Sequence, residues 1–424
     1  MGAQSEHDLG RPANRQSPTR RAQDAMNTVR YRSSALRIHA GQDALANLGN
    51  EAARLGAQRA FVVCGQTVAR RTDLLDRVRD ELGERYAGEF DGVQTSSPLP
   101  SVEAGVAAAR DASADLIVAV GGGSAVVTAR AIVILLAEKG DARELCTQYP
   151  PDGPPISPRL MAPKIPNIVV LTTPTTAMTR AGTAIVDPVR QHRLELFDPK
   201  TRPSTVIWDA DAMMTASPDL TMSAAASAFS GVATSLAVEG VNPIAEGDLR
   251  QSIRLLLDNM PRLRSEPENP DVRMNLASAS FLSNRAGDAE TGGRSVGFGV
   301  VTAVAHTIDT LYPTCSHGAA YAIATAPGLR FNAAHTADGQ ARLASALGVV
   351  GNGLSASANA DRAADKIASF FESAGMPVRM RDVGVPESDL PRIAHDAQEE
   401  FGLRRNARPV NGAEELMRLL REMH

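Results

Sequence analysis

Four consecutive small residues form the part of this sequence best suited to holding an anion. They follow an apolar run over 115–120 and precede a helix-forming run over 125–137. A buried strand that ends in a glycine turn at the start of a helix can bind phosphate, because glycine lets the backbone approach closely and the free N–H groups favour negative charge. A purely structural turn is the alternative. The predicted phosphate-binding residues are Gly121, Gly122, Gly123 and Ser124.

A second strand end carries hydroxyl groups. The apolar run 168–172 leads into Pro174 and then into three threonines, Thr175, Thr176 and Thr179. Threonine hydroxyls at a turn can hydrogen-bond a phosphate or a ribose. In a parallel sheet the two strand ends face one crevice, which is where nucleotides bind. We therefore predict that the glycines and the threonines bind one nucleotide together; a threonine-rich turn with capping roles is the alternative.

The composition excludes several classes of partner. The 424 residues carry a net charge of −4, and aromatic residues make up 4% of them. Such a chain has neither the basic field nor the aromatic rings of a nucleic-acid-binding protein, so we expect no nucleic-acid partner. The sequence has no apolar window of about 18 residues, so we expect no membrane span. Three cysteines far apart in the sequence indicate a reducing cytoplasm rather than disulfides.

The pattern along the chain predicts two domains after a polar tail. Residues 1–26 are polar, and we expect them to be disordered. From 27 to 210 short apolar runs alternate with helical patterns, which predicts an α/β nucleotide-binding domain with a parallel sheet. From 211 to 424 helical periodicity dominates, which predicts an all-α domain. A stretch with six prolines, 139–165, is predicted to be a long surface loop.

Individual elements follow from the same patterns. In the first domain we predict strands over 59–65, 115–120, 168–172 and 206–209, and helices over 72–82, 101–113 and 125–137. In the second we predict helices over 219–240, 245–258, 271–287, 297–311, 316–333, 338–347, 359–374, 387–400 and 412–423. The chain shows no internal repeat.

The order of these motifs resembles a known family. A glycine–serine loop, a Pro-Thr-Thr turn and a helical half that carries His317-Gly318 are similar to the iron-containing alcohol dehydrogenase superfamily, which shares its fold with dehydroquinate synthase. The resemblance covers about residues 30–424. It implies that the glycine loop holds the pyrophosphate of NAD or NADP, that the three threonines contact the dinucleotide, and that the substrate lies in the cleft between the domains of a homodimer. Gly65 replaces the acidic residue that often holds the adenosine ribose, which leaves NADP possible.

The metal site of that family is not matched. The family uses an Asp, a His four residues later and two further His residues, and the corresponding positions here are Val232, Leu236, Thr302 and His317. One imidazole among aliphatic neighbours cannot hold Fe²⁺ or Zn²⁺ usefully, so we predict no catalytic metal. A shifted site built on His306 and His317 is the alternative, although no carboxylate is evident beside them in the sequence.

The remaining polar residues suggest how a reductase could work without a metal. The chain is similar to the maleylacetate reductases, a metal-free branch of the family, around residues 296–307. We predict His306 as the first candidate proton donor and His317 as the second; a buried structural histidine bonded to a backbone carbonyl is the alternative for each. Asp309 could orient His306 or be a solvated helix residue. Arg180, where the family has a glycine, could bind a carboxylate or phosphate of the substrate, or lie on a solvated loop.

The function predicted from these residues is a metal-independent NAD(P)H-dependent reductase. Its substrate would be a small, anionic carbonyl compound or activated enone. Two alternatives remain at this point. The scaffold could perform a non-redox step such as elimination, cyclisation or isomerisation, or only bind a ligand. It could also be a metal-dependent alcohol dehydrogenase with a shifted site.

Overall fold

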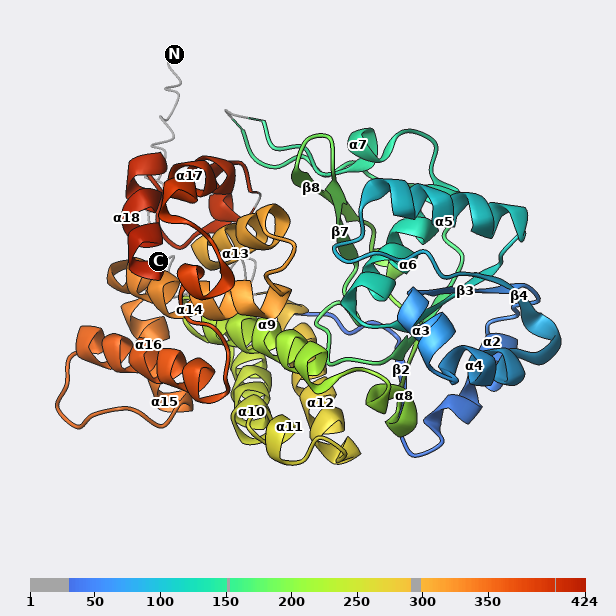
Figure 1. Cartoon of the computed structure of the whole chain (residues 1–424), viewed down its shortest axis with the longest axis horizontal. Helices are drawn as coiled ribbons and strands as arrows, with labels where there is room; N and C mark the ends of the chain where they lie inside the picture. Colours follow the sequence, from blue (N-terminus) through green and yellow to red (C-terminus); the bar gives the residue numbers. More distant parts are fainter. Residues whose placement is uncertain (1–29, 151–152, 291–298, 401) are drawn as a thin grey trace, which may run out of the picture.

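A computed structural model describes residues 30–150, 153–290, 299–400 and 402–424. The polar tail predicted over residues 1–26 lies outside these residues. One half of the molecule contains a twisted sheet with helices around it, and the other half is helical (Figure 1). This arrangement confirms the predicted fold class of an α/β N-terminal region followed by an all-α region.

The sheet of the first half has six strands, all parallel to their neighbours. Their order across the sheet is β2-β9-β6-β5-β3-β4. Chain order reverses between β3 and β5, and such a point is where open parallel sheets bind ligands. The strands are β2 (Arg37–Gly41), β3 (Ala60–Cys64), β4 (Tyr86–Phe90), β5 (Leu116–Gly121), β6 (Asn167–Leu171) and β9 (Thr205–Asp209).

The central strands are buried on both faces, which explains their nearly continuous apolar sequence. In β5, Ile117 and Ala119 pack under α5 (Leu99–Asp111) and α6 (Gly123–Ala137). The alternate residues Val118 and Val120 pack against helices on the opposite face. Those helices are α2 (Leu48–Arg54), α3 (Gln66–Arg71) and α4 (Leu74–Leu82).

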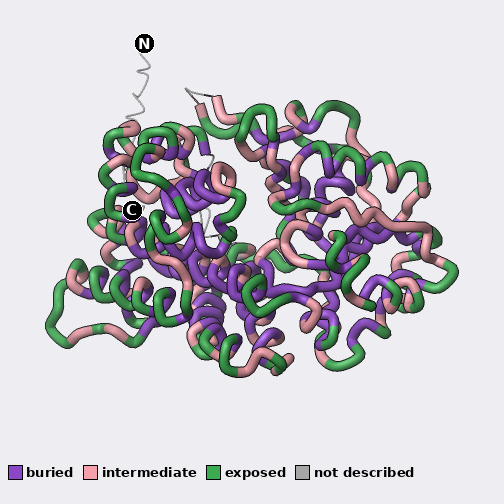
Figure 2. The backbone as a smooth tube through the Cα atoms, in the orientation of Figure 1, coloured by how far each residue is buried: buried purple, intermediate pink, exposed green. Residues whose placement is uncertain are grey.

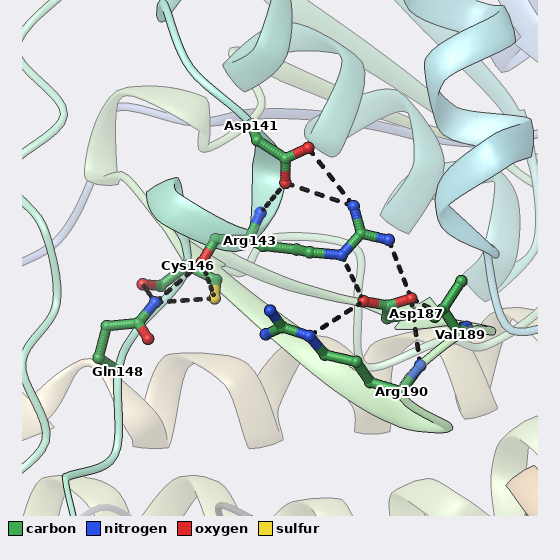
Figure 3. A network of polar contacts seen from close by, with 7 residues as sticks. All are labelled: Asp141, Arg143, Cys146, Gln148, Asp187, Val189 and Arg190. Atoms are coloured by element: carbon green, nitrogen blue, oxygen red, sulfur yellow. Dashed lines mark hydrogen bonds and ion pairs between the residues drawn. The ribbon is translucent and has the colours of Figure 1, made fainter.

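A two-stranded antiparallel hairpin, absent from the sequence prediction, projects beside the sheet. It consists of β7 (Gly182–Asp187) and β8 (His192–Phe197). Asp187, at the end of β7, is fully buried and accepts hydrogen bonds from Arg143 Nε at 2.7 Å and Nη2 at 3.1 Å (Figure 3). Arg143 lies on α7 (Ala142–Leu145), a short helix within the proline-rich stretch predicted as a loop. The ion pair therefore ties that stretch to the hairpin.

Replacing Asp187 with asparagine should destabilise the fold in a pH-dependent way. The Arg143 hydrogen bond and the N–H of Val189 hold the pKa of Asp187 below its ordinary value of 3.8. A carboxyl with a lowered pKa stabilises the folded state above 3.8, and this stabilisation is lost as the pH falls further. We expect Asp187→Asn to lower the free energy of unfolding by about 2 kcal/mol at pH 7.

Urea unfolding followed by circular dichroism, repeated from pH 7 to pH 3, tests this expectation. The difference from the unmodified protein should shrink at the acid end. Asp141→Asn is a matched control, because Asp141 is 45% exposed in its side chain and asparagine can still cap α7. Equal effects of the two substitutions would contradict a specific role for Asp187.

The second half is built from helices, as predicted. The central one, α9, is capped by the Ser217 hydroxyl, which accepts a hydrogen bond from Leu220 N. The helices are α8 (Ala210–Met214), α9 (Pro218–Leu236), α10 (Pro243–Asn259), α11 (Arg262–Ser265), α12 (Pro270–Gly287), α13 (Val300–Leu311), α14 (His317–Asn332), α15 (Ala337–Ala346), α16 (Ala356–Ser373), α17 (Leu390–Glu399) and α18 (Ala413–Met423). One short pair, β1 (Arg30–Tyr31) with β10 (Ala289–Glu290), joins the start of the described chain to this half.

Burial is concentrated in the sheet and in the inner helices of the second half (Figure 2). Aliphatic residues of α9, α10, α12, α14 and α16 form one core cluster, and α13, α14, α17 and α18 form another. Within the described part of the chain, no helix has the length and hydropathy needed to cross a bilayer.

Helix α12 connects the two halves. Its Ser280 hydroxyl donates a 2.6 Å hydrogen bond to the carbonyl of Pro174, just after β6. Its Phe281 ring packs edge-on against Trp208 of β9, with ring centroids 6.0 Å apart. Arg273, also on α12 and almost fully buried, donates to the carbonyls of Met213 and Ala216. These contacts fix the turn after β6 relative to the helical half.

Candidate functional site

The glycine loop has the predicted geometry. β5 ends at Gly121, whose φ of +146° is rare for other residues, and Gly122 precedes the first turn of α6. The first N–H groups of a helix have no partner within the helix and carry partial positive charge. A Cβ atom on Gly122 would lie 2.8 Å from Thr173 Oγ1, and one on Gly123 would lie 3.1 Å from Thr175 Oγ1. The missing side chains therefore let the threonine turn after β6 pack directly against this loop.

The threonine turn lies beside that loop. β5 and β6 are neighbours in parallel register, and Thr172 N donates a 3.0 Å hydrogen bond to Gly121 O. Thr175 is buried, and its Oγ1 accepts from Ala177 N, whereas Thr176 is partly exposed. The structure thus brings the two predicted motifs together. It also adds Thr173, which the sequence analysis did not select although it precedes Pro174 in the same turn.

Thr179 lies at the far end of the turn and is engaged with the helical half. Its hydroxyl oxygen accepts a 3.0 Å hydrogen bond from Asn284 Nδ2 of α12. A hydroxyl that accepts one bond can still donate one. Thr179 therefore keeps a proton for a ligand, but its position depends on α12.

His317 is the accessible histidine of the site. It is the first residue of α14, after the capping Ser316, and its side chain is 46% exposed. Its Nδ1 hydrogen-bonds the Asp309 carboxylate of α13. Among the described residues no hydrogen bond engages Nε2, which is therefore open to a ligand. The sequence analysis considered Asp309 as a residue that could orient His306; the structure pairs it with His317 instead.

Asp309 is held in turn by Arg193. Arg193 Nη2 of β8 donates to both carboxylate oxygens, at 2.9 and 3.2 Å, and both side chains are buried. Burial would raise the pKa of Asp309, but the charge of Arg193 and the hydrogen bond to His317 outweigh it, so this pKa lies well below its ordinary value. Asp309 is therefore ionised, and the chain Arg193–Asp309–His317 crosses from the hairpin of the first half into the helical half.

His306 is enclosed. Its Nδ1 lies 3.3 Å from Glu400 Oε2, and its Nε2 lies 3.3 Å from the Tyr321 hydroxyl. Burial and the charge of Arg193 lower the pKa of His306, which favours the neutral ring. With both nitrogens engaged, His306 is less suited than His317 to deliver a proton to a bound ligand.

The two histidines nevertheless belong to one cluster. Their rings are stacked, with centroids 5.9 Å apart, and Tyr321 lies edge-on to His317 at 4.9 Å. Burial raises the pKa of Tyr321, a hydrogen bond from Thr302 acts against that rise, and the more distant charge of Arg180 also acts against it. Arg180 therefore lies within electrostatic range of the cluster, and its side chain is exposed.

Two family models match consecutive parts of the chain. Residues 35–210 match the model described as iron-containing alcohol dehydrogenase, and residues 228–423 match the C-terminal model of the Fe-containing alcohol dehydrogenase family. The chain belongs to the iron-containing alcohol dehydrogenase superfamily. It is an oxidoreductase of that superfamily.

Individual relatives are distant but nearly full length. Lactaldehyde reductase of Escherichia coli K12 is 27% identical over 85% of this chain and 91% of its own. Maleylacetate reductase 2 of Cupriavidus pinatubonensis is 30% identical over 58% of this chain and 60% of its own. A solved structure of 1,3-propanediol oxidoreductase, 24% identical, superposes with a TM-score of 0.82 over 94% of this chain and all of that one.

Of the four residues that the sequence analysis aligned with the family's metal ligands, only His317 carries a usual ligand group. Val232 and Leu236 are fully buried in the aliphatic core of α9, and Thr302 hydrogen-bonds Tyr321. Two carboxylates, Asp309 and Glu400, lie beside the histidines; the sequence analysis had named Asp309 but not Glu400. In the described residues, however, no three His, Cys, Asp or Glu side chains converge as a metal site would require.

A cavity of about 650 Å³ borders the first turn of α13. Thr302 lines it together with Glu239, Asn332, Arg404 and Asn406. His306, His317 and Arg180 are not among its lining residues. The cavity therefore does not mark the histidine cluster, and the residues above define the candidate site on their own contacts.

Proposed function

We propose that this oxidoreductase is a metal-independent, NAD(P)H-dependent reductase of a small anionic carbonyl compound or activated enone. The observation that carries the proposal is the exposed His317, whose Nδ1 is fixed by Asp309 where the family would place metal ligands. The relatives named lactaldehyde reductase and maleylacetate reductase support reduction of a carbonyl or enone.

The dinucleotide would be held by the first half of the molecule. The N–H groups of Gly122 to Ser124 would bind the pyrophosphate. The hydroxyls of Thr175, Thr176 and Thr179 would contact other parts of the dinucleotide. When bound, a reduced nicotinamide supplies a hydride to the carbonyl carbon of the substrate. NAD and NADP both remain candidates, because Gly65 itself carries no carboxylate to repel a 2′-phosphate.

His317 would supply the proton. Nε2–H of its protonated ring donates to the oxygen that becomes the alcohol hydroxyl, and the ring returns to the neutral form with Nδ1–H still on Asp309. Asp309 keeps the ring oriented and stabilises its charge, while Arg193 keeps Asp309 in place. A fixed imidazolium thus does for the developing alkoxide what a Lewis acid does in metal-dependent relatives.

Cofactor titration with metal analysis tests the proposal. We expect calorimetry to detect binding of NADH or NADPH below millimolar concentration. We expect prolonged treatment with EDTA to leave turnover unchanged, because aliphatic residues replace the ligands. Binding of neither dinucleotide would refute the proposal. Stoichiometric iron or zinc in active protein would favour the metal-dependent alternative, and a tightly held cofactor that keeps its redox state during turnover would favour the non-redox one.

A further inference from the structure

The loop from Ala177 to Gly182 is held by two arginines, the buried Arg130 and the half-buried Arg202. Arg130 of α6, 1% exposed, donates to Ala177 O at 2.7 Å and to Gly182 O at 2.8 Å, so it grips both ends of the loop. Arg202 donates to Thr179 O at 3.0 Å. The loop that presents Arg180 is therefore rigid.

Helix α12 fixes the side chains of the same loop. The carboxamide of Asn284, itself 8% exposed, makes two contacts at once: Nδ2 donates to Thr179 Oγ1 at 3.0 Å, and Oδ1 accepts from Arg180 Nε at 3.4 Å. Nε takes the bond to Asn284, and the two Nη groups at the end of the guanidinium have no hydrogen-bond partner among the described residues. That end is the edge with which arginine binds carboxylates and phosphates in a bidentate manner.

The charges around Arg180 are uncompensated. Arg202 is paired with Asp288, but neither Arg130 nor Arg180 has a carboxylate partner among the residues that the structure describes. Burial lowers the pKa of Arg130 to about 9, and the nearby Arg180 and Arg202 contribute, yet Arg130 is still charged at neutral pH. Two unpaired guanidinium groups close together favour a bound anion.

We propose that Asn284 is a positioning residue that holds Arg180 open as a subsite for the carboxylate or phosphate of the substrate. The proposal rests on the proposed function, because it places this anion next to the reacting carbonyl. The site requires an amide at position 284, because the amide oxygen orients Arg180 Nε without carrying a charge. An aspartate in its place would pair with Arg180 and neutralise it. Asn284 thereby decides whether the enzyme selects anionic or neutral substrates.

Calorimetric titration of malonate into the NADPH-saturated protein, or the NADH-saturated protein if that cofactor binds better, tests the subsite without relying on turnover. Inorganic phosphate is titrated in parallel, and the tighter of the two anions identifies the favoured group. Dimethyl malonate is the uncharged control. We expect Asn284→Asp and Arg180→Gln each to weaken anion binding at least about tenfold. Asn275→Asp, the same change on the same helix but at a side chain that contacts Asn259, should have no effect.

Kinetics separate positioning from a general structural role. For 4-oxobutanoate at saturating cofactor, Asn284→Asp should raise KM and leave kcat largely unchanged, whereas KM for its methyl ester should not move. Asn284→Ala, which keeps the Arg180 charge, should be intermediate. Malonate and phosphate that bind Arg180→Gln as tightly as the unmodified protein would overturn the subsite.

The outcomes also distinguish the two proposals. If Asn284→Asp binds anions like the unmodified protein while Arg180→Gln does not, Arg180 binds the anion but Asn284 does not position it. If neither dinucleotide binds, the proposed function fails, and the same anion titrations on the cofactor-free protein still decide the subsite. Circular dichroism of each variant verifies that the fold is retained.

Discussion

Replacing His317 with glutamine should reduce turnover by about a thousandfold while dinucleotide binding stays unchanged. Glutamine can still hydrogen-bond Asp309 but cannot transfer a proton at neutral pH. The imidazole also stabilises the developing alkoxide, so both contributions disappear together. Because His317 is 46% exposed, the loss should come from chemistry rather than from unfolding.

Steady-state reduction of the best available aldehyde, together with calorimetric titration of the cofactor, measures the two quantities. His335→Gln is the control, since His335 is an exposed histidine outside the site. Turnover within about threefold of the unmodified protein would eliminate His317 as the proton donor, because general acids contribute far more than this. His306 would then be the next residue to replace, although its burial makes a stability measurement essential.

Replacing Gly122 with alanine should strongly weaken dinucleotide binding. The new methyl group would sit 2.8 Å from Thr173 Oγ1, and either the loop or the threonine turn would have to move. Both elements are predicted to hold the cofactor, and a displacement of about 1 Å can reduce a well-oriented reaction or contact about a hundredfold. We therefore expect the dissociation constant for NADH or NADPH to rise by at least about a hundredfold.

Gly231→Ala is the matched control for this substitution. Gly231 lies inside α9, and a Cβ there would meet nothing within 4 Å outside its own helix. Alanine is a better helix former than glycine, so this variant should be as stable as the unmodified protein or up to about 1 kcal/mol more stable. If Gly122→Ala binds the cofactor as well as Gly231→Ala does, the glycine loop is not the pyrophosphate site.

The sequence predicted the parts of the site that depend on local pattern. The apolar run before Gly121, the glycine turn and the helical run after it correspond to β5 and α6, and the run before Pro174 corresponds to β6. These elements follow from periodicity and from turn residues, which are encoded within a few positions. The shift from α/β alternation to helices near residue 211 is visible for the same reason.

The partnerships across the molecule could not be predicted in this way. Asp309 lies one turn after His306 in the sequence, but the packing of α13 against α14 pairs its carboxylate with His317. Arg193 reaches Asp309 from a hairpin whose alternating strands carried no strong signal. Asn284 is 104 residues from its partner Arg180. Contacts of this kind are set by tertiary packing, and the periodic patterns of a single sequence do not indicate which distant residues meet.

The edge-on contact between Trp208 and Phe281 lies where the two halves of the molecule meet, so Trp208 is a natural fluorescence probe of this interface. Trp208 is the single tryptophan of the chain, and its indole N–H is buried without a hydrogen-bond partner in the described structure. The indole projects from β9 of the sheet and packs against Phe281 of α12. Its intrinsic emission therefore originates where the two halves meet, so a change in the packing of the two halves can be followed in the native chain without attaching a dye.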